Sequence, residues 1–210
     1  MVMAYKVLIV EDQNIPRELF RIYIDSSEEF EHVLSISNAS TALSICQNNE
    51  VDLILMDVMT DLGHSGLQAA EEIKKEFPEI KIIIVTSMPE YSWLSRARAI
   101  GVDSFWYKDG QKDSLIDVMK RTMNGEHIYP DTTPLIKIGN ATNHDFTERE
   151  LDVLKELATG DTNSEIAERL FISPATVKSH IQHLMEKTGF KTRTELVAEA
   201  RGLGIVINDK

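Results

Sequence analysis

The sequence predicts an α/β unit built on a doubly wound five-stranded parallel sheet, followed by a small all-α unit of four helices. Over roughly the first 123 residues, short apolar runs alternate with helix-length segments, as in a series of β-α units. Residues 53–56 (Leu-Ile-Leu-Met) are apolar without a break, which is typical of a strand covered by helices on both faces. After about residue 145, only apolar residues at helical spacing remain.

Each predicted strand is followed by a segment long enough for a helix. The strands are predicted at residues 7–10, 32–36, 53–56, 82–86 and 104–107, and the helices at residues 15–26, 39–49, 67–77, 90–100 and 111–123. Helix-end signals agree, since Asn38 or Ser40 can cap the second helix, Pro78 stops the third and Gly101 follows the fourth. Parallel strands joined in this way imply right-handed crossovers.

Residues 124–144 break this pattern and are predicted to be a linker with turns, because prolines and glycines interrupt them. The segment also contains apolar residues that could dock on either unit: Ile128, Leu135, Ile136 and Ile138. The predicted domains are therefore residues 1–123 and 145–210, with this linker between them.

Residues 145–210 carry the start signals of short helices. Thr147 and Glu150 have the spacing of a capping box, and Thr162 or Asn163 can cap a second helix. A third helix opens at Ser173-Pro174. Its apolar residues fall on one stripe, at Val177, Ile181, Leu184 and Met185. With a fourth helix near residues 194–201, this arrangement predicts a helix-turn-helix, whose third helix has a polar outer face.

Charge is distributed unevenly along the chain. The net charge is −12 over 210 residues, so the chain as a whole does not indicate nucleic-acid binding. Residues 1–125 hold 12 basic and 20 acidic side chains, net −8, whereas residues 174–193 hold four basic side chains against one acidic, net +3. Three excess charges alone usually form a solvated face. Together with a helix-turn-helix, they favour contact with a phosphate backbone.

The compartment is predicted from what the sequence lacks. A single cysteine, Cys46, excludes an internal disulfide and fits a reducing environment. The first six residues run directly into a strand, which leaves no room for a signal peptide. Apolar runs stay well below the ~20 residues that a membrane span needs. We therefore expect a cytoplasmic protein that has no membrane partner.

Polar side chains follow four of the predicted strands. Glu11 and Asp12 come after the first strand and Asp57 after the third, while Thr86 and Lys108 come after the fourth and fifth. In a sheet of order 2-1-3-4-5, the first and third strands flank the topological switch point, so the three carboxylates should converge. Carboxylates at close range repel each other unless a cation neutralises them, and Mg²⁺ prefers such ligands together with phosphate oxygens. The pattern predicts a phosphoryl site with Asp57 as nucleophile.

These residues resemble those of the receiver domain of bacterial two-component response regulators, which has a flavodoxin-like fold. The resemblance implies that Asp57 is the phospho-acceptor and that Mg²⁺ is held by Glu11, Asp12, Asp57 and the backbone carbonyl of Met59. It also implies that Thr86 and Lys108 contact the phosphoryl group and that Phe105 is the switch aromatic. Ser87, next to Thr86, is small enough to leave the phosphoryl group accessible to a donor. These roles fall on Glu11, Asp12, Asp57, Met59, Thr86, Ser87, Phe105 and Lys108.

Two departures from the family pattern concern the first acid and the loop after Asp57. Glu11 stands where many members have Asp, so this longer side chain is expected to reach Mg²⁺ through water. The loop at residues 58–66 closes on Gly66 one residue late, which leaves its path open. Neither departure removes a functional group from the predicted site.

Residues 151–192 resemble the LuxR-type helix-turn-helix, which places the whole chain in the NarL/FixJ subfamily. The resemblance implies that Lys178, Ser179 and Gln182 face base edges in the major groove. It assigns phosphate contacts to Thr176, His183, Lys187 and Arg193. The fourth helix matches the dimer surface of the family, so a homodimer would place two half-sites about one DNA turn apart.

The function predicted from the sequence is a transcription regulator that a sensor histidine kinase phosphorylates on Asp57 and that then binds promoter DNA as a dimer. Its only chemistry would be Mg²⁺-dependent self-phosphorylation and self-dephosphorylation. One alternative is a phosphatase with an aspartyl nucleophile, but such enzymes carry a second Asp two residues later, where this chain has Met59. The other alternative is a DNA-binding protein whose first domain serves only for dimerisation or ligand binding.

Overall fold

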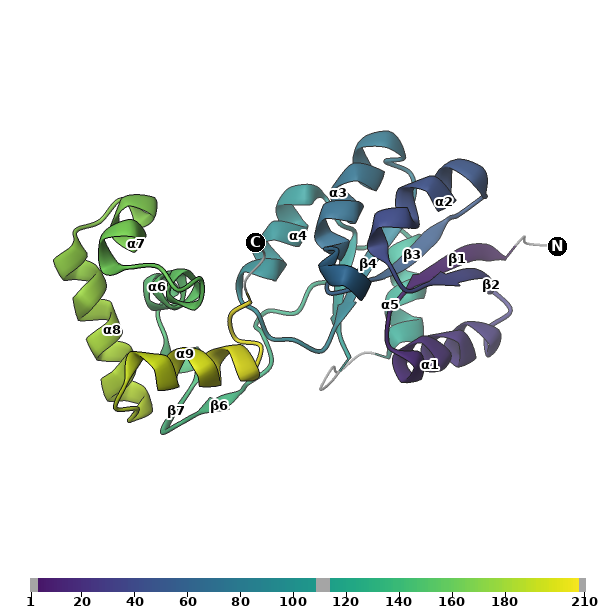
Figure 1. The fold of residues 1–210 in the computed structure, drawn as a ribbon. Coiled ribbons are helices and arrows are strands. Elements are labelled where there is room, and N and C mark those ends of the chain that lie inside the picture. The colour runs from purple at the N-terminus through teal and green to yellow at the C-terminus, as the bar shows by residue number, and fades with distance from the viewer. Residues whose placement is uncertain (1–3, 109–113, 208–210) are drawn as a thin grey trace. The chain divides into compact units, whose positions relative to one another are not determined.

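The computed structural model describes residues 4–108 and 114–207, which separate into two compact units (Figure 1). The first unit comprises Met1–Ser87 and Ser92–Thr132, and the second comprises Met88–Tyr91 and Thr133–Lys210. The predicted start of the helix at residue 111 lies outside the described residues.

The first unit is built on the predicted parallel sheet. Among the described residues its strands are β1 (Tyr5–Val10), β2 (Phe30–Ile36), β3 (Leu53–Asp57), β4 (Lys81–Thr86) and β5 (Ser104–Tyr107). Their order is β2-β1-β3-β4-β5, and every neighbouring pair is parallel, so the predicted doubly wound sheet is confirmed. Central strand β3 is buried at every residue, as its unbroken apolar sequence predicts.

Helices cover both faces of this sheet. They are α1 (Asn14–Asp25), α2 (Ala42–Asn48), α3 (Gly66–Glu76), α4 (Ser92–Ile100) and α5 (Leu115–Met123). Helices α1 and α5 lie on one face, and α2, α3 and α4 lie on the other (Figure 1). The core beneath α1 and α5 joins Phe20 and Val118 to alternate residues of β1, β3 and β4. Asn38 caps the 3-10 turn Ala39–Thr41 that precedes α2, so the segment predicted as one helix is divided in two.

The second unit contains the four predicted helices. They are α6 (Glu148–Ala158), α7 (Asn163–Leu170), α8 (Pro174–Thr188) and α9 (Arg193–Gly202). Side chains of Thr147, Thr162 and Ser173 each accept a hydrogen bond from a backbone N–H three residues later, which satisfies a donor that the first turn leaves free. The predicted stripe of α8 is buried at Val177, Ile181 and Leu184.

The prediction that residues 124–144 form only a linker is wrong in part. The short strands β6 (Lys137–Ile138) and β7 (Ala141–Thr142) form an antiparallel hairpin, and Ile138 and Ala141 belong to the core of the second unit. Gly139 turns the chain at φ +59°, and a Cβ there would lie 2.2 Å from the Thr188 carbonyl oxygen. Two-residue strands are too short to show the alternation that reveals longer strands, so the sequence pattern missed this hairpin.

The other part of the predicted linker packs on the first unit. The Ile128 side chain packs against the core beneath α5, and its carbonyl oxygen accepts a hydrogen bond from the Phe105 N–H of β5. Leu135 is exposed, whereas Ile136 packs against the core of the second unit.

Cys46 is buried, and burial raises the pKa of its thiol to about 11, which makes the thiol inert at neutral pH.

In residues 4–108 and 114–207, none of the helices combines the length and the apolar character needed to cross a membrane.

Candidate functional site

The three carboxylates predicted to converge do so at the carboxyl edge of the sheet. Glu11 and Asp12 directly follow β1, and Asp57 is the last residue of β3. Strands β1 and β3 pair with Val10 opposite Met56, which brings the following residues side by side. Glu11, Asp12 and Asp57 each offer a carboxylate oxygen, and these oxygens lie within 4.8 Å of one another.

The ammonium group of Lys108 lies between two of these acids. Its Nζ donates a hydrogen bond of 2.5 Å to Glu11 Oε2 and one of 2.9 Å to Asp57 Oδ2. Lys108 follows β5 directly, and its backbone N–H donates to the Thr86 carbonyl oxygen, so the end of β5 is tied to the end of β4. The site therefore unites residues that lie up to 97 positions apart in the chain.

Burial controls the electrostatics of this site. Glu11 is fully buried and Asp57 is only 4% exposed. Burial, which disfavours the charged carboxylate, raises the pKa of Asp57 to about 7, with the Lys108 ammonium opposing the shift and the Glu11 charge adding to it. For Lys108 burial works against the ammonium, but the two carboxylates outweigh it and raise the pKa of the lysine. Asp57 is thus an acid held close to the point of ionisation at neutral pH.

Asp12 fits a cation ligand. Its Oδ1 is buried and has no hydrogen-bond partner within the part of the chain that the structure describes. A buried carboxylate oxygen without a donor is costly unless another positive partner is present. The oxygen-only donor set also suits Mg²⁺ rather than a softer metal.

Thr86 and Phe105, the residues assigned to switching, lie on strands β4 and β5. Thr86 is buried at the end of β4 and pairs in register with Tyr107, while Phe105 pairs with Ile84 and is buried. Ser87, the next residue after Thr86, is exposed.

The loop after Asp57, whose path the sequence left open, is a small hairpin. Met59 and Ser65 form an antiparallel bridge, and the turn between them places Leu62 and Gly63 at φ +63° and +74°. The Thr60 side chain pins the loop by accepting from the Ala39 N–H at 3.0 Å and donating to the His64 carbonyl. The turn thus accommodates the one extra residue that places Gly66 later than in the family pattern.

Gly66 is a site residue that the sequence prediction missed. An added Cβ would lie 1.9 Å from the backbone oxygen of Asp57, so only glycine allows α3 to start this close to the acceptor. The signal was present in the sequence, because a glycine closes the loop, but its reason is a backbone contact that sequence spacing does not reveal.

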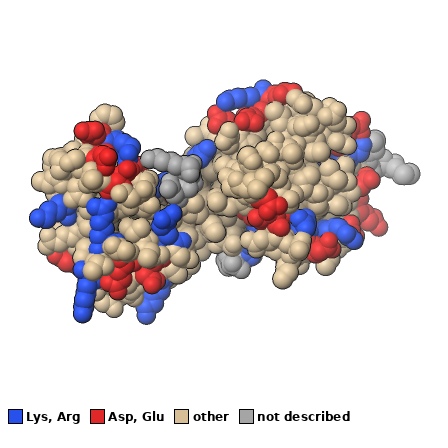
Figure 2. Space-filling model, viewed as in Figure 1, with Lys and Arg blue, Asp and Glu red and all other residues tan. Residues whose placement is uncertain are grey.

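The outer face of α8 presents most of the residues predicted to contact DNA. Those fully on the surface are Thr176, Lys178, Ser179, Gln182 and His183. The amide nitrogen of Gln182 donates to Glu186 at 2.8 Å, so its oxygen remains as an acceptor on this face. In Figure 2, basic and acidic side chains are interspersed over the surface of the second unit, at the left of the view.

Two other residues predicted to contact phosphate have structural partners. Lys187 donates to the buried carboxylate of Glu150 at 2.7 Å and to the Asp145 carbonyl at 2.9 Å. The Arg193 guanidinium donates to the Asp161 carbonyl and to Asn163 Oδ1 at the start of α7. Both side chains hold helices of the second unit together, whatever they contribute to DNA binding.

Comparisons with known proteins agree with this arrangement. Residues 7–120 match the family model described as "Response regulator receiver domain", and residues 144–200 match that of "Bacterial regulatory proteins, luxR family". The chain is 33% identical to the response regulator protein VraR of Staphylococcus epidermidis over 204 residues, which covers 94% of this chain and 97% of the relative. It is 31% identical to VraR of Staphylococcus aureus over the same length and coverage.

Solved structures show the same fold. A structure described as two RcsB dimers bound to two parallel DNAs matches with a TM-score of 0.64 at 20% identity and covers 96% of this chain and 100% of that one. RcsB from Salmonella enterica serovar Typhimurium, bound to promoter rprA in the presence of phosphomimetic BeF3⁻, matches with a TM-score of 0.62 at 19% identity over 93% and 97%. The chain belongs to the response regulators that join a receiver domain to a LuxR-type DNA-binding domain.

Proposed function

We propose that Asp57 is the phospho-acceptor of this response regulator and that its donor is a sensor histidine kinase. The single observation that carries this assignment is the position of the Lys108 ammonium between Glu11 and Asp57 at the carboxyl edge of the sheet. A cation fixed against the acceptor is already placed to pair with the oxygens of an incoming phosphoryl group. Asp57 is also the last residue of the central strand β3 and is only 4% exposed.

The transfer itself is a displacement at phosphorus. A carboxylate oxygen of Asp57 forms a bond to phosphorus as the bond from phosphorus to the donor histidine nitrogen breaks, and the electron pair of that bond stays with the imidazole. Lys108 stabilises the charge on the phosphoryl oxygens. Hydrolysis of the phosphorylated Asp57, in which water attacks phosphorus and the carboxylate leaves, is the only other reaction that we assign to the chain.

The metal in this proposal is Mg²⁺, held by Asp12, Asp57 and the Met59 carbonyl, with Glu11 reaching it through water. The unpartnered buried oxygen of Asp12 supports this assignment. When bound, Mg²⁺ supplies positive charge that neutralises the three acids and the phosphoryl oxygens. Together with Lys108, the bound metal would offset the negative charge of Glu11 and Asp57.

Thr86 and Phe105 are proposed to carry the signal away from the site. A phosphoryl group on Asp57 adds oxygens that the Thr86 hydroxyl can reach by moving inward, and Phe105 on the neighbouring strand fills the space that this movement leaves. The two strands are paired in register at these positions, which supports coupled movement. The result is a shift between two arrangements rather than a switch from no activity to full activity.

The output is proposed to be promoter binding by a homodimer in the cytoplasm. Lys178, Ser179 and Gln182 would read base edges, with phosphate contacts from Thr176 and His183 and further support from Lys187 and Arg193. Helix α9 would form the dimer contact. The RcsB structures, which are described as DNA complexes and in one case as two dimers on DNA, support this reading for the same fold.

The proposal is tested by measuring DNA binding with and without beryllofluoride and Mg²⁺, which mimic the phosphorylated acceptor. We expect tighter binding to a promoter fragment in the wild type and no change in Asp57→Ala. An equal response in both proteins would contradict Asp57 as the acceptor. No response in either would favour a first domain that serves only for dimerisation.

A further inference from the structure

A short segment after α5 covers the free edge of the sheet. Residues 127–129, here called the strap, run beside β5, the edge strand. The Phe105 N–H donates to the Ile128 carbonyl at 2.8 Å, and the Ile128 N–H donates to the Ser104 hydroxyl at 3.1 Å. The strap therefore satisfies part of the exposed edge of β5, through one backbone hydrogen bond and one to a side chain.

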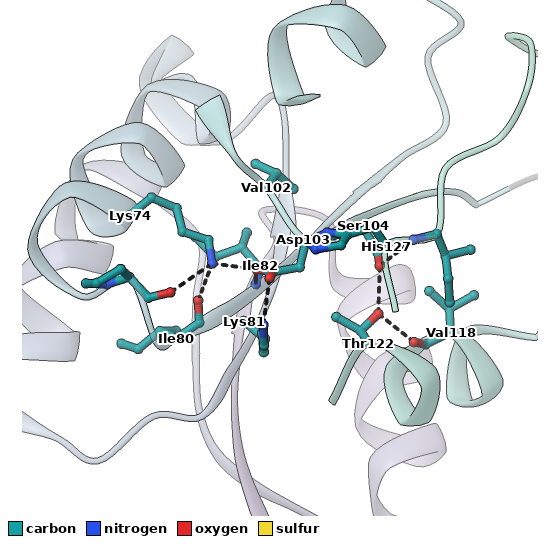
Figure 3. A network of polar contacts seen from close by, with 12 residues as sticks. Lys74, Ile80, Lys81, Ile82, Val102, Asp103, Ser104, Val118, Thr122 and His127 are labelled. Carbon is teal, nitrogen blue, oxygen red and sulfur yellow. Dashed lines mark hydrogen bonds and ion pairs between the residues drawn. The ribbon is translucent and has the colours of Figure 1, made fainter. Parts of the chain in front are cut away.

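Polar side chains, of which Ser104 and Thr122 are buried, anchor the start of the strap (Figure 3). The hydroxyl groups of Ser104 and Thr122 are 2.7 Å apart, and Thr122 also donates to the Val118 carbonyl of α5. The His127 ring donates from Nδ1 to the Asp103 carbonyl at 3.0 Å, since a carbonyl can only accept. Strap, β5 and α5 are thus joined by one hydrogen-bonded network.

Tyr129 at the end of the strap touches the switch aromatic. The centroid of the Tyr129 ring is 6.3 Å from that of Phe105. The guanidinium carbon of Arg98 in α4 lies over the Tyr129 ring, 4.1 Å from its centroid. The Tyr129 hydroxyl donates to the Val102 carbonyl at 2.8 Å. Tyr129 is therefore held between α4 and Phe105, on the face that the switch is expected to rearrange.

The strap is close to the acid site through the backbone. Phe105 bonds the strap on one side and pairs with β4 on the other, and two residues later Tyr107 pairs with Thr86. The next residue, Lys108, binds Glu11 and Asp57. A change at the acceptor thus reaches the strap through the four residues from Phe105 to Lys108.

We propose that the strap is a latch that is closed while Lys108 pairs with Asp57 and opens when Asp57 carries a phosphoryl group. This inference rests on the proposed function and adds its output step. Movement of Thr86 and Phe105 removes the surface on which the Tyr129 ring rests, and the strap then leaves the β5 edge. Because the chain continues from the strap into the second unit, opening of residues 127–129 lengthens the tether by up to about 10 Å. The DNA-binding unit gains freedom to pair with a second copy.

Amide hydrogen exchange on the full-length protein tests the latch directly. The Ile128 and Phe105 amides are bonded across the strap and should exchange slowly in the resting wild type. Beryllofluoride with Mg²⁺ is expected to speed exchange at Ile128 about tenfold or more, while the interior β4 amides stay protected and Asp57→Asn shows no response. Tighter DNA binding without faster exchange at Ile128 would overturn the latch and leave the proposed function intact. Absence of both responses would overturn both.

Variants that loosen the strap should imitate the phosphorylated state. Arg98→Ala removes only an exposed cation over the Tyr129 ring, so it should speed Ile128 exchange about two- to fivefold in the resting protein. Tyr129→Phe loses the bond to Val102, and Tyr129→Ala loses the ring as well, so exchange should rise further in that order. The matched control is Arg21→Ala on α1, whose guanidinium faces Glu18 and Asp25 and which should change nothing.

DNA binding gives the second readout for these variants. The unphosphorylated Arg98→Ala and Tyr129→Ala proteins should bind a promoter fragment more tightly than the wild type and respond less to beryllofluoride. Faster strap exchange with unchanged DNA binding would show that the strap is only a cover for the sheet edge, and would overturn the latch.

Discussion

The acid site and the DNA-facing surface of α8 are built in opposite ways. The acid site gathers buried groups from the ends of several strands, and burial raises the pKa of Asp57 to about 7 while the neighbouring charges of Lys108 and Glu11 lower and raise it. The α8 surface presents neighbouring residues of one helix in water. A buried site made by topology should fail as a whole when one contact is lost, whereas an exposed helix face should lose affinity one contact at a time.

The largest effect should follow from a single added carbon atom at the acid site. Gly66→Ala would place a Cβ 1.9 Å from the Asp57 backbone oxygen, so α3 or the acceptor must shift. We expect a loss of about 2–4 kcal/mol in the free energy of unfolding, together with strongly impaired phosphorylation. Urea unfolding and acetyl phosphate labelling measure the two effects.

The matched control for this substitution is Gly202→Ala at the end of α9, where an added Cβ has no neighbour within 4 Å. It should leave phosphorylation unchanged and alter the unfolding free energy by less than about 1 kcal/mol. Equal effects of the two substitutions would contradict a specific contact between Gly66 and the acceptor.

The buried acid should give the metal-free protein an unusual pH dependence. The pKa of Asp57 is raised from 3.8 to about 7 by burial, so between these values the folded state binds more protons than the unfolded state. Stability from this group is therefore complete below about pH 4 and is lost as the pH rises through 7. In EDTA, Asp57→Asn should gain stability over the wild type between pH 5 and pH 8, by an amount on the order of 2–3 kcal/mol.

Urea unfolding at both pH values checks this dependence. A constant difference between the two proteins would mean that Lys108 keeps Asp57 ionised throughout. Adding Mg²⁺ at pH 8 should stabilise the wild type and have much less effect on Asp57→Asn, because the metal favours the ionised carboxylate.

Two lysines of α8 should separate DNA contact from structure. Lys178 is exposed, so Lys178→Ala should weaken binding to a specific site by about 1–3 kcal/mol and leave stability unchanged. Lys187 pairs with Glu150, which is only 4% exposed, so Lys187→Ala should cost about 1–2 kcal/mol of stability by leaving that carboxylate without its cation. Thermal unfolding and fluorescence anisotropy measure the two effects. Equal stability losses would refute the distinction.

The smallest effect concerns the loop beside the acceptor. Leu62 is 88% exposed and has a left-handed backbone at φ +63°, a conformation that costs a residue with a Cβ about 1 kcal/mol. Leu62→Gly should therefore raise the unfolding free energy by a few tenths to about 1 kcal/mol. A destabilised variant would show that the leucine side chain makes a contact that its exposure conceals.

The sequence predicted the sheet and the acid site well because both follow from strand order. Unbroken apolar runs identify the strands, and the switch-point rule then places Glu11 beside Asp57 without knowledge of any contact. The same reasoning missed what depends on backbone approach, such as the closeness of Gly66 to Asp57. It also missed short segments that form backbone hydrogen bonds with a neighbour, namely the hairpin of residues 137–142 and the strap beside β5. The structural partners of Lys187 and Arg193 were hidden because they lie 30 or more positions away in the chain.

The central claim is that Asp57 accepts a phosphoryl group in a site that needs Mg²⁺, and peptide mapping of the protein after incubation with acetyl phosphate tests it most directly. We predict one phosphorylated peptide, containing Asp57, that forms with Mg²⁺, fails to form in EDTA and is absent from Asp57→Asn. Phosphorylation that persists in Asp57→Asn, or that forms equally well in EDTA, would contradict the claim.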